Sequence, residues 1–229
     1  SRMASITGTY GADTLKGGEG KDFLIGLDGN DTLKGGVGND TLIGNNGDDS
    51  LLGQDGDDRL EGGPGLDYLD GGDGKNTIEG GDGDDRIYNK EWSSSSESIL
   101  LAGQGNDYVR GTGELIDGGD GNDTLVSGLG GDSLYGGAGN DEVHINDELN
   151  YNFSVVDGGS GEDTLVVRQV NWQVGGGKRL DFSVVKGFEK LELGRYAGQI
   201  VLSDSIFSAG LDAEVGVYKI DGSYDSYGG

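Results

Sequence analysis

Aspartate recurs in this sequence at nine-residue intervals, each time inside a glycine-rich run. Nine contiguous nonapeptides lead from Gly8 to Tyr88, and the first three read GTYGADTLK, GGEGKDFLI and GLDGNDTLK. Asp occupies the sixth place of eight of them, and Asn76 replaces it in GGDGKNTIE. Carboxylate oxygens are the ligands that hard divalent cations prefer. The chemistry that this spacing indicates is therefore cation binding.

Five further copies extend the pattern, so that fourteen copies cover 126 residues. They are AGQGNDYVR from Ala102, GGDGNDTLV from Gly118, SGLGGDSLY from Ser127, GGAGNDEVH from Gly136 and GGSGEDTLV from Gly158. A fixed period of this length is the signature of a repeat architecture.

The repeat also specifies the elements that must hold the aspartates. Its last three residues, such as Thr14-Leu15-Lys16, alternate polar and apolar as a short strand does, and its first six resemble a turn. One large apolar residue in nine cannot be buried by a lone repeat, so repeats must stack. Two strands and two turns then form one 18-residue coil of a parallel roll.

Stacking places the sixth-place Asp of one coil above its equivalent 18 residues away. Two carboxylates about 5 Å apart repel each other by roughly 3 kcal/mol at an effective dielectric constant of about 20. A divalent cation between them reverses the sign of this interaction, and Ca²⁺ suits it because it accepts six to eight oxygens in irregular geometry. The competing interpretation, in which Asp-Gly pairs form hairpin turns, does not require a strict period of nine.

The repeat resembles G-G-x-G-x-D-x-U-x, where U is a large apolar residue, which is typical of the RTX (repeats-in-toxin, hemolysin-type) family of bacterial type I secreted proteins. The resemblance implies an all-β fold: a right-handed parallel β-roll (β-helix or solenoid) of nonapeptide repeats. It also implies Ca²⁺ sites formed by the sixth-place Asp with the carbonyls of places two and four. The fourth-place carbonyls expected to bind are those of Gly11, Gly29, Gly47, Gly65, Gly83, Gly105, Gly121, Gly139 and Gly161.

Three stretches depart from the repeat: residues 89–101, 111–117 and 145–157. They can be linkers between three small rolls, and the Ser93–Ser96 run suits that reading. We favour altered half-turns, because each stretch ends in an apolar triplet that keeps a strand. With Leu100, Ile116 and Val156 at the eighth place, the chain makes 17 half-turns from Gly8 to Val166.

Alternate half-turns then differ in their aspartates. The odd edge carries Asp13, Asp31, Asp49, Asp67, Asp85, Asp107, Asp123, Asp141 and Asp163 without a gap. The even edge carries Asp22, Asp40 and Asp58, then Asn76, two altered half-turns, Asp132 and a third altered half-turn. Glu114 or Asp147 are the candidate partners of Asp132. We expect a single roll with one continuous and one interrupted calcium edge, holding about ten or eleven Ca²⁺ ions.

The charge distribution limits the partners. The formal net charge is −26, and residues 8–166 hold 25 Asp and 9 Glu against 8 Lys and Arg. Such a surface repels phosphate, so nucleic acid and an anionic membrane surface are disfavoured. The sequence has no Cys and no run of about 18 apolar residues, so neither a disulfide nor a transmembrane segment is expected.

The sequence contains no recognisable catalytic motif. The one histidine, His144, stands at the ninth place of a repeat, where we expect an edge position and no catalytic role. There is no G-x-S-x-G, H-E-x-x-H or P-loop motif, and the acidic residues are committed to turns. We expect no enzyme activity in this chain.

The flanking regions lack the repeat. Residues 1–7 are interpreted as a cloning remnant or N-terminal edge, and residues 8–166 as the roll. Residues 167–229 contain no G-x-G-x-D turn and are expected to form a β-rich C-terminal cap, or further irregular coils. Strand-like runs within and next to this region are Thr164–Val170, Phe182–Val185, Lys190–Leu193 and Gln199–Leu202.

Two functions of different classes follow. The first is a calcium-binding module of a large secreted or cell-surface protein, unfolded at cytosolic calcium and folding outside the cell. The resemblance implies export by type I secretion machinery and an extracellular location. The alternative is an outer-face binding module of an adhesin or surface-layer protein, with a polysaccharide or cell-surface ligand. The third-place residues Tyr10, Glu19, Asp28 and Val37 are not uniform, which speaks against a regular binding face there.

Overall fold

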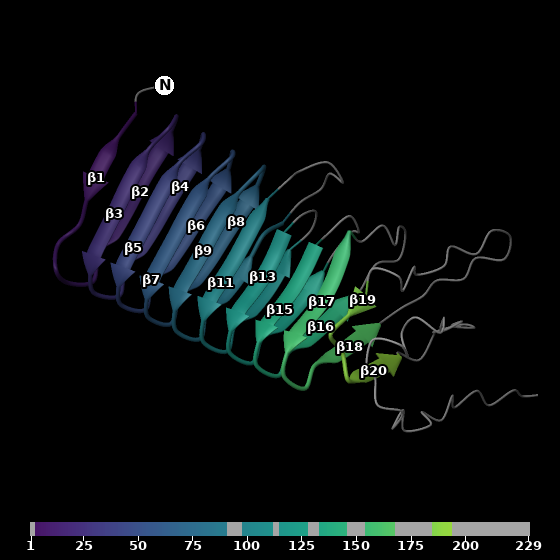
Figure 1. The fold of residues 1–229 in the computed structure, drawn as a ribbon. Helices are drawn as coiled ribbons and strands as arrows, with labels where there is room; N and C mark the ends of the chain where they lie inside the picture. Colours follow the sequence, from purple (N-terminus) through teal and green to yellow (C-terminus); the bar gives the residue numbers. More distant parts are fainter. Residues whose placement is uncertain are drawn as a thin grey trace, which may run out of the picture.

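The fold is a parallel β-roll built from two ten-stranded sheets (Figure 1). The computed structural model describes residues 3–90, 98–111, 115–127, 133–145, 154–167 and 185–193. Odd-numbered strands form one sheet and even-numbered strands the other, so the chain crosses between the sheets at every turn. The predicted all-β parallel roll is confirmed.

The odd-numbered sheet contains β1 (Ser5–Thr7), β3 (Phe23–Asp28), β5 (Thr41–Asn46), β7 (Arg59–Pro64), β9 (Thr77–Asp82), β11 (Ile99–Gln104), β13 (Leu115–Asp120), β15 (Ser133–Ala138), β17 (Val155–Ser160) and β19 (Val185–Lys186). The even-numbered sheet contains β2 (Thr14–Glu19), β4 (Thr32–Val37), β6 (Ser50–Asp55), β8 (Tyr68–Asp73), β10 (Arg86–Tyr88), β12 (Tyr108–Gly111), β14 (Thr124–Ser127), β16 (Glu142–Ile145), β18 (Thr164–Val167) and β20 (Lys190–Leu193).

The register passes through the irregular stretches without a shift. Leu100 of β11 pairs with Ile78 on one side and with Ile116 on the other. Val156 of β17 pairs with Leu134. Each irregular stretch therefore keeps the strand of a half-turn, and the chain forms one roll. The linker interpretation, with three independent rolls, is wrong.

The core is a column of eighth-place side chains between the two sheets. Sixteen of the seventeen are buried, and Leu15 packs partly buried at the N-terminal end. Because successive residues of a strand point to opposite faces, the seventh- and ninth-place side chains lie on the outer faces of the sheets, although the ninth-place Val126, His144 and Val166 are buried there. The edge position expected for His144 is therefore wrong, because this residue is only 6% exposed. Most half-turns thus contribute a single apolar residue to the core, and Ala102, Ile145 and Phe188 are additional members.

The strands are longer than the sequence pattern predicted. A typical strand has six residues, as in Thr32–Val37, and includes places one to three of the next repeat. The expectation of three-residue strands with six-residue turns is wrong, because ladder pairing continues through Gly18↔Gly36 and Glu19↔Val37. The chain bends there by a positive φ at the second place, +121° at Gly36 and +89° even at Leu27. Only places four to six remain as the turn.

Both ends of the described roll extend beyond residues 8–166. Ser5–Thr7 pair with Phe23–Ile25, so these residues belong to the odd-numbered sheet. At the other end β19 pairs with β17 and β20 pairs with β18, which adds another coil from the region expected to form the cap. The strand-like run Gln199–Leu202 lies outside the described residues. Within the described ranges no helix is long and apolar enough to cross a membrane.

Candidate metal centre

The sixth-place aspartates form a hydrogen-bonded row along each edge of the roll. Asp49 donates its backbone N–H to Oδ1 of Asp67 at 2.7 Å, and Asp67 donates to Oδ1 of Asp85 at 2.8 Å. The same contact links every successive pair on the odd edge, from Asp13 to Asp163. One carboxylate oxygen of each residue is thus fixed by the preceding coil, which sets the orientation of the other.

The second carboxylate oxygen of these residues is buried without a hydrogen-bond partner. This holds for Oδ2 of Asp22, Asp31, Asp40, Asp49, Asp58, Asp67, Asp85, Asp107, Asp123, Asp141 and Asp163. None of these side chains is more than 3% exposed. A buried charged oxygen with no donor is strongly unfavourable, and repetition on this scale points to a ligand that neutralises the row.

Ten of the eleven orphaned oxygens lie beside a main-chain carbonyl of the next coil; the contact is not shown for Asp107, which follows Ala102 and not a first-place glycine. A Cβ on Gly62 would collide with Oδ2 of Asp67 and would approach the carbonyl oxygen of Gly80 to 2.6 Å. Glycine at the first place therefore leaves room for the carboxylate, and both oxygens face the same narrow space. Since both are acceptors, only a proton or a cation can satisfy them together.

Carbonyls of the second and fourth places point along the same edges. A Cβ on Gly36 would meet the carbonyl oxygen of Gly18, and one on Gly47 would meet that of Gly29. Of the fourth-place carbonyls predicted to bind, this direction is shown for Gly29, Gly47, Gly65, Gly83, Gly105, Gly121 and Gly139. At Gly29 the nearest atom of Gly11 is its carbonyl carbon and not its carbonyl oxygen. Gly161 is the last fourth-place glycine of the odd edge, so no later one reports the direction of its carbonyl. The predicted carbonyls therefore share the turn with the aspartates, and their coordination of a metal remains a prediction.

Burial makes the charged form of these aspartates unfavourable. Desolvation raises the pKa of Asp67 to about 7, the hydrogen bond from the Asp49 N–H lowers it, and the charge of Asp49 raises it again. The pKa is likewise raised to about 7 for Asp58, Asp85 and Asp123, and to about 6 for Asp49, Asp107 and Asp141. A bound divalent cation opposes this shift, because it favours the ionised carboxylate.

The donor set fits calcium better than a transition metal. Among the described residues, no group of three or more His, Cys, Asp or Glu side chains could hold a metal ion. Each space instead offers carboxylate and main-chain carbonyl oxygens from two coils, which is the chemistry that Ca²⁺ accepts. The sites that the residues fit are thus formed between coils, by oxygen ligands alone.

The row of aspartates on the even edge is interrupted at Asn76, and the structure shows which groups take its place. Asn76 Nδ2 donates to Oδ1 of Asn89 at 2.7 Å, and Asn89 Nδ2 donates to Oγ of Ser98 at 3.0 Å. Ser98 Oγ also accepts the N–H of Asn76 at 2.9 Å. These buried neutral groups fill the space beside Gly71 that carboxylate and carbonyl occupy elsewhere. A neutral hydrogen-bond network therefore replaces a cation site at this coil.

Two predicted ligands stand apart from the buried row. Asp13 lies at the N-terminal end, where its Oδ2 accepts hydrogen bonds from the N–H of Thr9 at 2.5 Å and from Thr9 Oγ1 at 2.9 Å. Asp132, with its candidate partners Glu114 and Asp147, lies outside the described residues. Oδ2 of Asp13 therefore differs from the orphaned oxygens of the buried aspartates.

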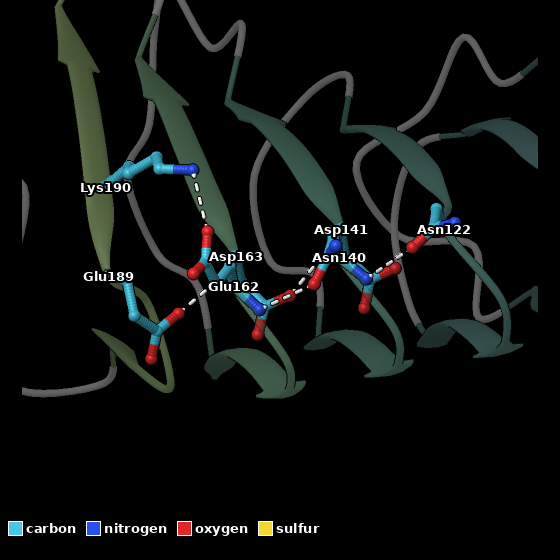
Figure 2. A network of polar contacts seen from close by, with 7 residues as sticks. All are labelled: Asn122, Asn140, Asp141, Glu162, Asp163, Glu189 and Lys190. Carbon is cyan, nitrogen blue, oxygen red and sulfur yellow. Dashed lines mark hydrogen bonds and ion pairs between the residues drawn. The ribbon is translucent and has the colours of Figure 1, made fainter.

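A second, exposed row runs outside the odd edge. Asn140 donates to Oδ1 of Asn122 at 2.7 Å and Glu162 to Oδ1 of Asn140 at 2.8 Å, each through the backbone N–H (Figure 2). Asn122 makes the same contact with Oδ1 of Asn106 at 2.9 Å. These fifth-place side chains point toward the C-terminal end, whereas the aspartates point toward the N-terminal end. The paired rows fasten each turn to both neighbouring turns.

Glu189 is the member of the row that sequence reasoning missed. Its Oε2 accepts the backbone N–H of Asp163 at 2.7 Å, as the next Asp does in every other coil (Figure 2). No G-x-G-x-D motif precedes it. The available signal was the Gly187-Phe188-Glu189 run immediately before the strand-like Lys190–Leu193.

Comparison with known families agrees with this geometry. The family model of the RTX calcium-binding nonapeptide repeat matches four times, over residues 7–42, 34–69, 61–89 and 117–144. A search of curated proteins found no match to the chain. The matched residues include most of both aspartate rows.

Proposed function

This chain belongs to the RTX calcium-binding nonapeptide repeat family, and from that premise we propose that it is a calcium-triggered folding module of a secreted or cell-surface bacterial protein. The observation that carries the proposal is the set of eleven buried carboxylate oxygens without donors, which lie in two rows, one on each edge of the roll. Without metal, the burial of these carboxylates opposes folding. With calcium bound, the ions shared by these carboxylates hold adjacent coils together.

The residues that would hold the ions are the sixth-place aspartates of successive coils with the carbonyls of the same turns. The odd edge offers eight spaces between its nine aspartates, and the even edge offers Asp22/Asp40 and Asp40/Asp58. Asp58/Asn76 is a weaker space, because Asn76 brings no charge and its amide is engaged with Asn89. This supports the number of about ten or eleven ions. Bound Ca²⁺ supplies positive charge and shared coordination between coils. The chain itself supplies pre-aligned oxygens, because each Oδ1 is already fixed by a backbone N–H.

The expected calcium affinity makes the folding of this module depend on its location. Extracellular calcium-binding modules have dissociation constants of about 10⁻⁴–10⁻³ M, far above cytosolic calcium. A ligand that binds only the folded state stabilises it by mass action, so the chain stays unfolded inside the cell and folds outside. We propose that the unfolded chain is the form exported by type I secretion machinery, and that the module acts by binding and folding, without catalysis.

The decisive experiment is a calcium titration followed by circular dichroism, with magnesium as the control. We expect a disordered spectrum in chelator and a cooperative gain of β signal at sub-millimolar to millimolar Ca²⁺. Mg²⁺ should not substitute, because it requires rigid octahedral geometry and loses water reluctantly. A β spectrum that chelator leaves unchanged contradicts the proposal. Native mass spectrometry then counts the ions.

A second candidate function, ligand binding by the outer face, has one observation in its favour. Tyr68, Tyr88 and Tyr108 cluster on the outer face of the even-numbered sheet, with ring centroids 5.3 and 5.8 Å apart. Aromatic rings of this kind stack against apolar faces of ligands. A glycan array probed with the calcium-bound protein and with its Tyr88→Ala variant tests this function. Binding lost in the variant supports it, and no binding by either protein rejects it.

A further inference from the structure

The last described coil closes the odd edge with a shortened turn. In the preceding coil, Asp163 follows its first-place glycine, Gly158, by five residues, whereas Glu189 follows Gly187 by two. The longer glutamate side chain reaches the position of the missing aspartate and accepts the Asp163 N–H at 2.7 Å. Both Glu189 and Lys190 also donate their backbone N–H groups to the Asp163 carbonyl, at 3.1 and 3.0 Å.

Gly187 takes the place of the first-place glycine in this turn. A Cβ on Gly158 would meet the Gly187 carbonyl oxygen and would lie 2.8 Å from Oδ2 of Asp163. The same two oxygen types, the carboxylate and the next first-place carbonyl, face each other in the regular coils. Phe188, which lies between Gly187 and Glu189 in the sequence, is only 6% exposed. Its side chain belongs to the apolar core and anchors the shortened turn.

The space beside Asp163 contains a carboxylate oxygen that no protein group in the described ranges satisfies. Its side chain is fully buried and its Oδ2 has no hydrogen-bond partner. The two lysines that the structure describes in this coil are engaged elsewhere: Lys186 lies 2.6 Å from Oδ2 of Asp157, and Lys190 lies 3.4 Å from Oε2 of Glu162. These two ion pairs engage the flanking acids, and among the described residues no basic side chain pairs with Asp163 or Glu189.

We propose that Asp163 and Glu189 hold one further divalent cation, with the Gly187 carbonyl as a third oxygen ligand. This site rests on the proposed calcium function and extends it past the last nonapeptide, into a stretch that the family model does not match. Glu189, which lies next to Asp163 (Figure 2), is then the ligand that ends the odd row. The ion holds β19 and β20 against the roll.

The test is ion counting by native mass spectrometry on the whole chain, at a calcium concentration that just saturates the wild type. Glu189→Gln keeps the size of the side chain and an acceptor oxygen for the Asp163 N–H, but removes the charge. We expect it to bind one ion fewer. Glu192→Gln, an equal change of charge on exposed β20, is the matched control and should keep the full number.

Asp163→Asn gives an independent count, because Asp163 faces Asp141 on one side and Glu189 on the other. The proposal predicts the loss of two ions from this variant, and a roll that ends at Asp163 predicts the loss of one. An unchanged count in Glu189→Gln, or a loss of one in Asp163→Asn, overturns the inference. If the wild type binds no calcium, the proposed function itself has failed. If the wild type binds calcium and only these counts disagree, the terminal site alone is rejected.

Discussion

The backbone N–H of Asp49 donates to Oδ1 of Asp67 at 2.7 Å, from a residue that carries the same buried charge. The contact orients the Asp67 carboxylate so that Oδ2 faces the next coil without a donor. Each coil therefore prepares half of the ligand set for its neighbour, and the arrangement is complete only when coils stack.

Replacing one member of the odd row tests this dependence. We expect Asp67→Asn to keep the hydrogen bond from Asp49 through its amide oxygen but to lose the charge that both adjacent spaces use. The calcium midpoint of folding should rise several-fold, which corresponds to about 1 kcal/mol or more. Circular dichroism titration measures the midpoint. The control is Asp82→Asn, an equal change of charge at an exposed third place of the same edge, where a shift of similar size would contradict the interpretation.

The core column makes a prediction that concerns packing alone. Leu60 is fully buried, and Leu60→Ala should lower the free energy of unfolding by about 2–5 kcal/mol because it leaves a cavity. Leu66 is 58% exposed, and Leu66→Ala should change it by no more than about 0.5 kcal/mol. Denaturant unfolding in saturating calcium compares the two. Equal effects would show that the eighth place is not the core position.

The raised pKa values predict how metal-free protein responds to pH. Asp58, Asp67, Asp85 and Asp123 have a folded pKa of about 7 against an ordinary value of 3.8, so the folded chain binds more protons than the unfolded chain between these values. The stability of the metal-free roll is therefore greatest at and below pH 4 and is lost as the pH rises through 7.

Circular dichroism of calcium-depleted protein between pH 4 and pH 8 checks this dependence. We expect β signal at the acidic end and its loss toward neutral pH. The affinity for calcium should show the opposite trend. Calcium should bind more weakly at pH 5 than at pH 7.5, because it must displace protons from the carboxylates. A metal-free spectrum that is constant across the range would mean that these carboxylates do not control folding.

The neutral network on the even edge should behave differently from the aspartate rows. Asn89 is buried, and Asn89→Ala leaves Asn76 Nδ2 without its 2.7 Å acceptor. We expect the free energy of unfolding in saturating calcium to fall by about 1–3 kcal/mol. The number of bound ions by native mass spectrometry should not change. Loss of an ion would show that this coil binds calcium after all.

The sequence by itself determined the roll, its eighth-place core and the two aspartate edges. The reason is that a strict nine-residue period leaves one apolar residue in each half-turn, and parallel stacking is the arrangement that buries it. The same counting placed Leu100, Ile116 and Val156 in the core, although their half-turns lack the motif.

Only the tertiary structure decided how the aspartates are held and where their row ends. Hydrogen bonds between residues 18 positions apart depend on the register of whole coils, so no local pattern reveals that Oδ1 is satisfied and Oδ2 is not. The same holds for Glu189, which joins the odd edge across 26 residues from Asp163. Its position follows from the packing of Phe188 and the pairing of β20 with β18, which are contacts between coils and not features of a repeat.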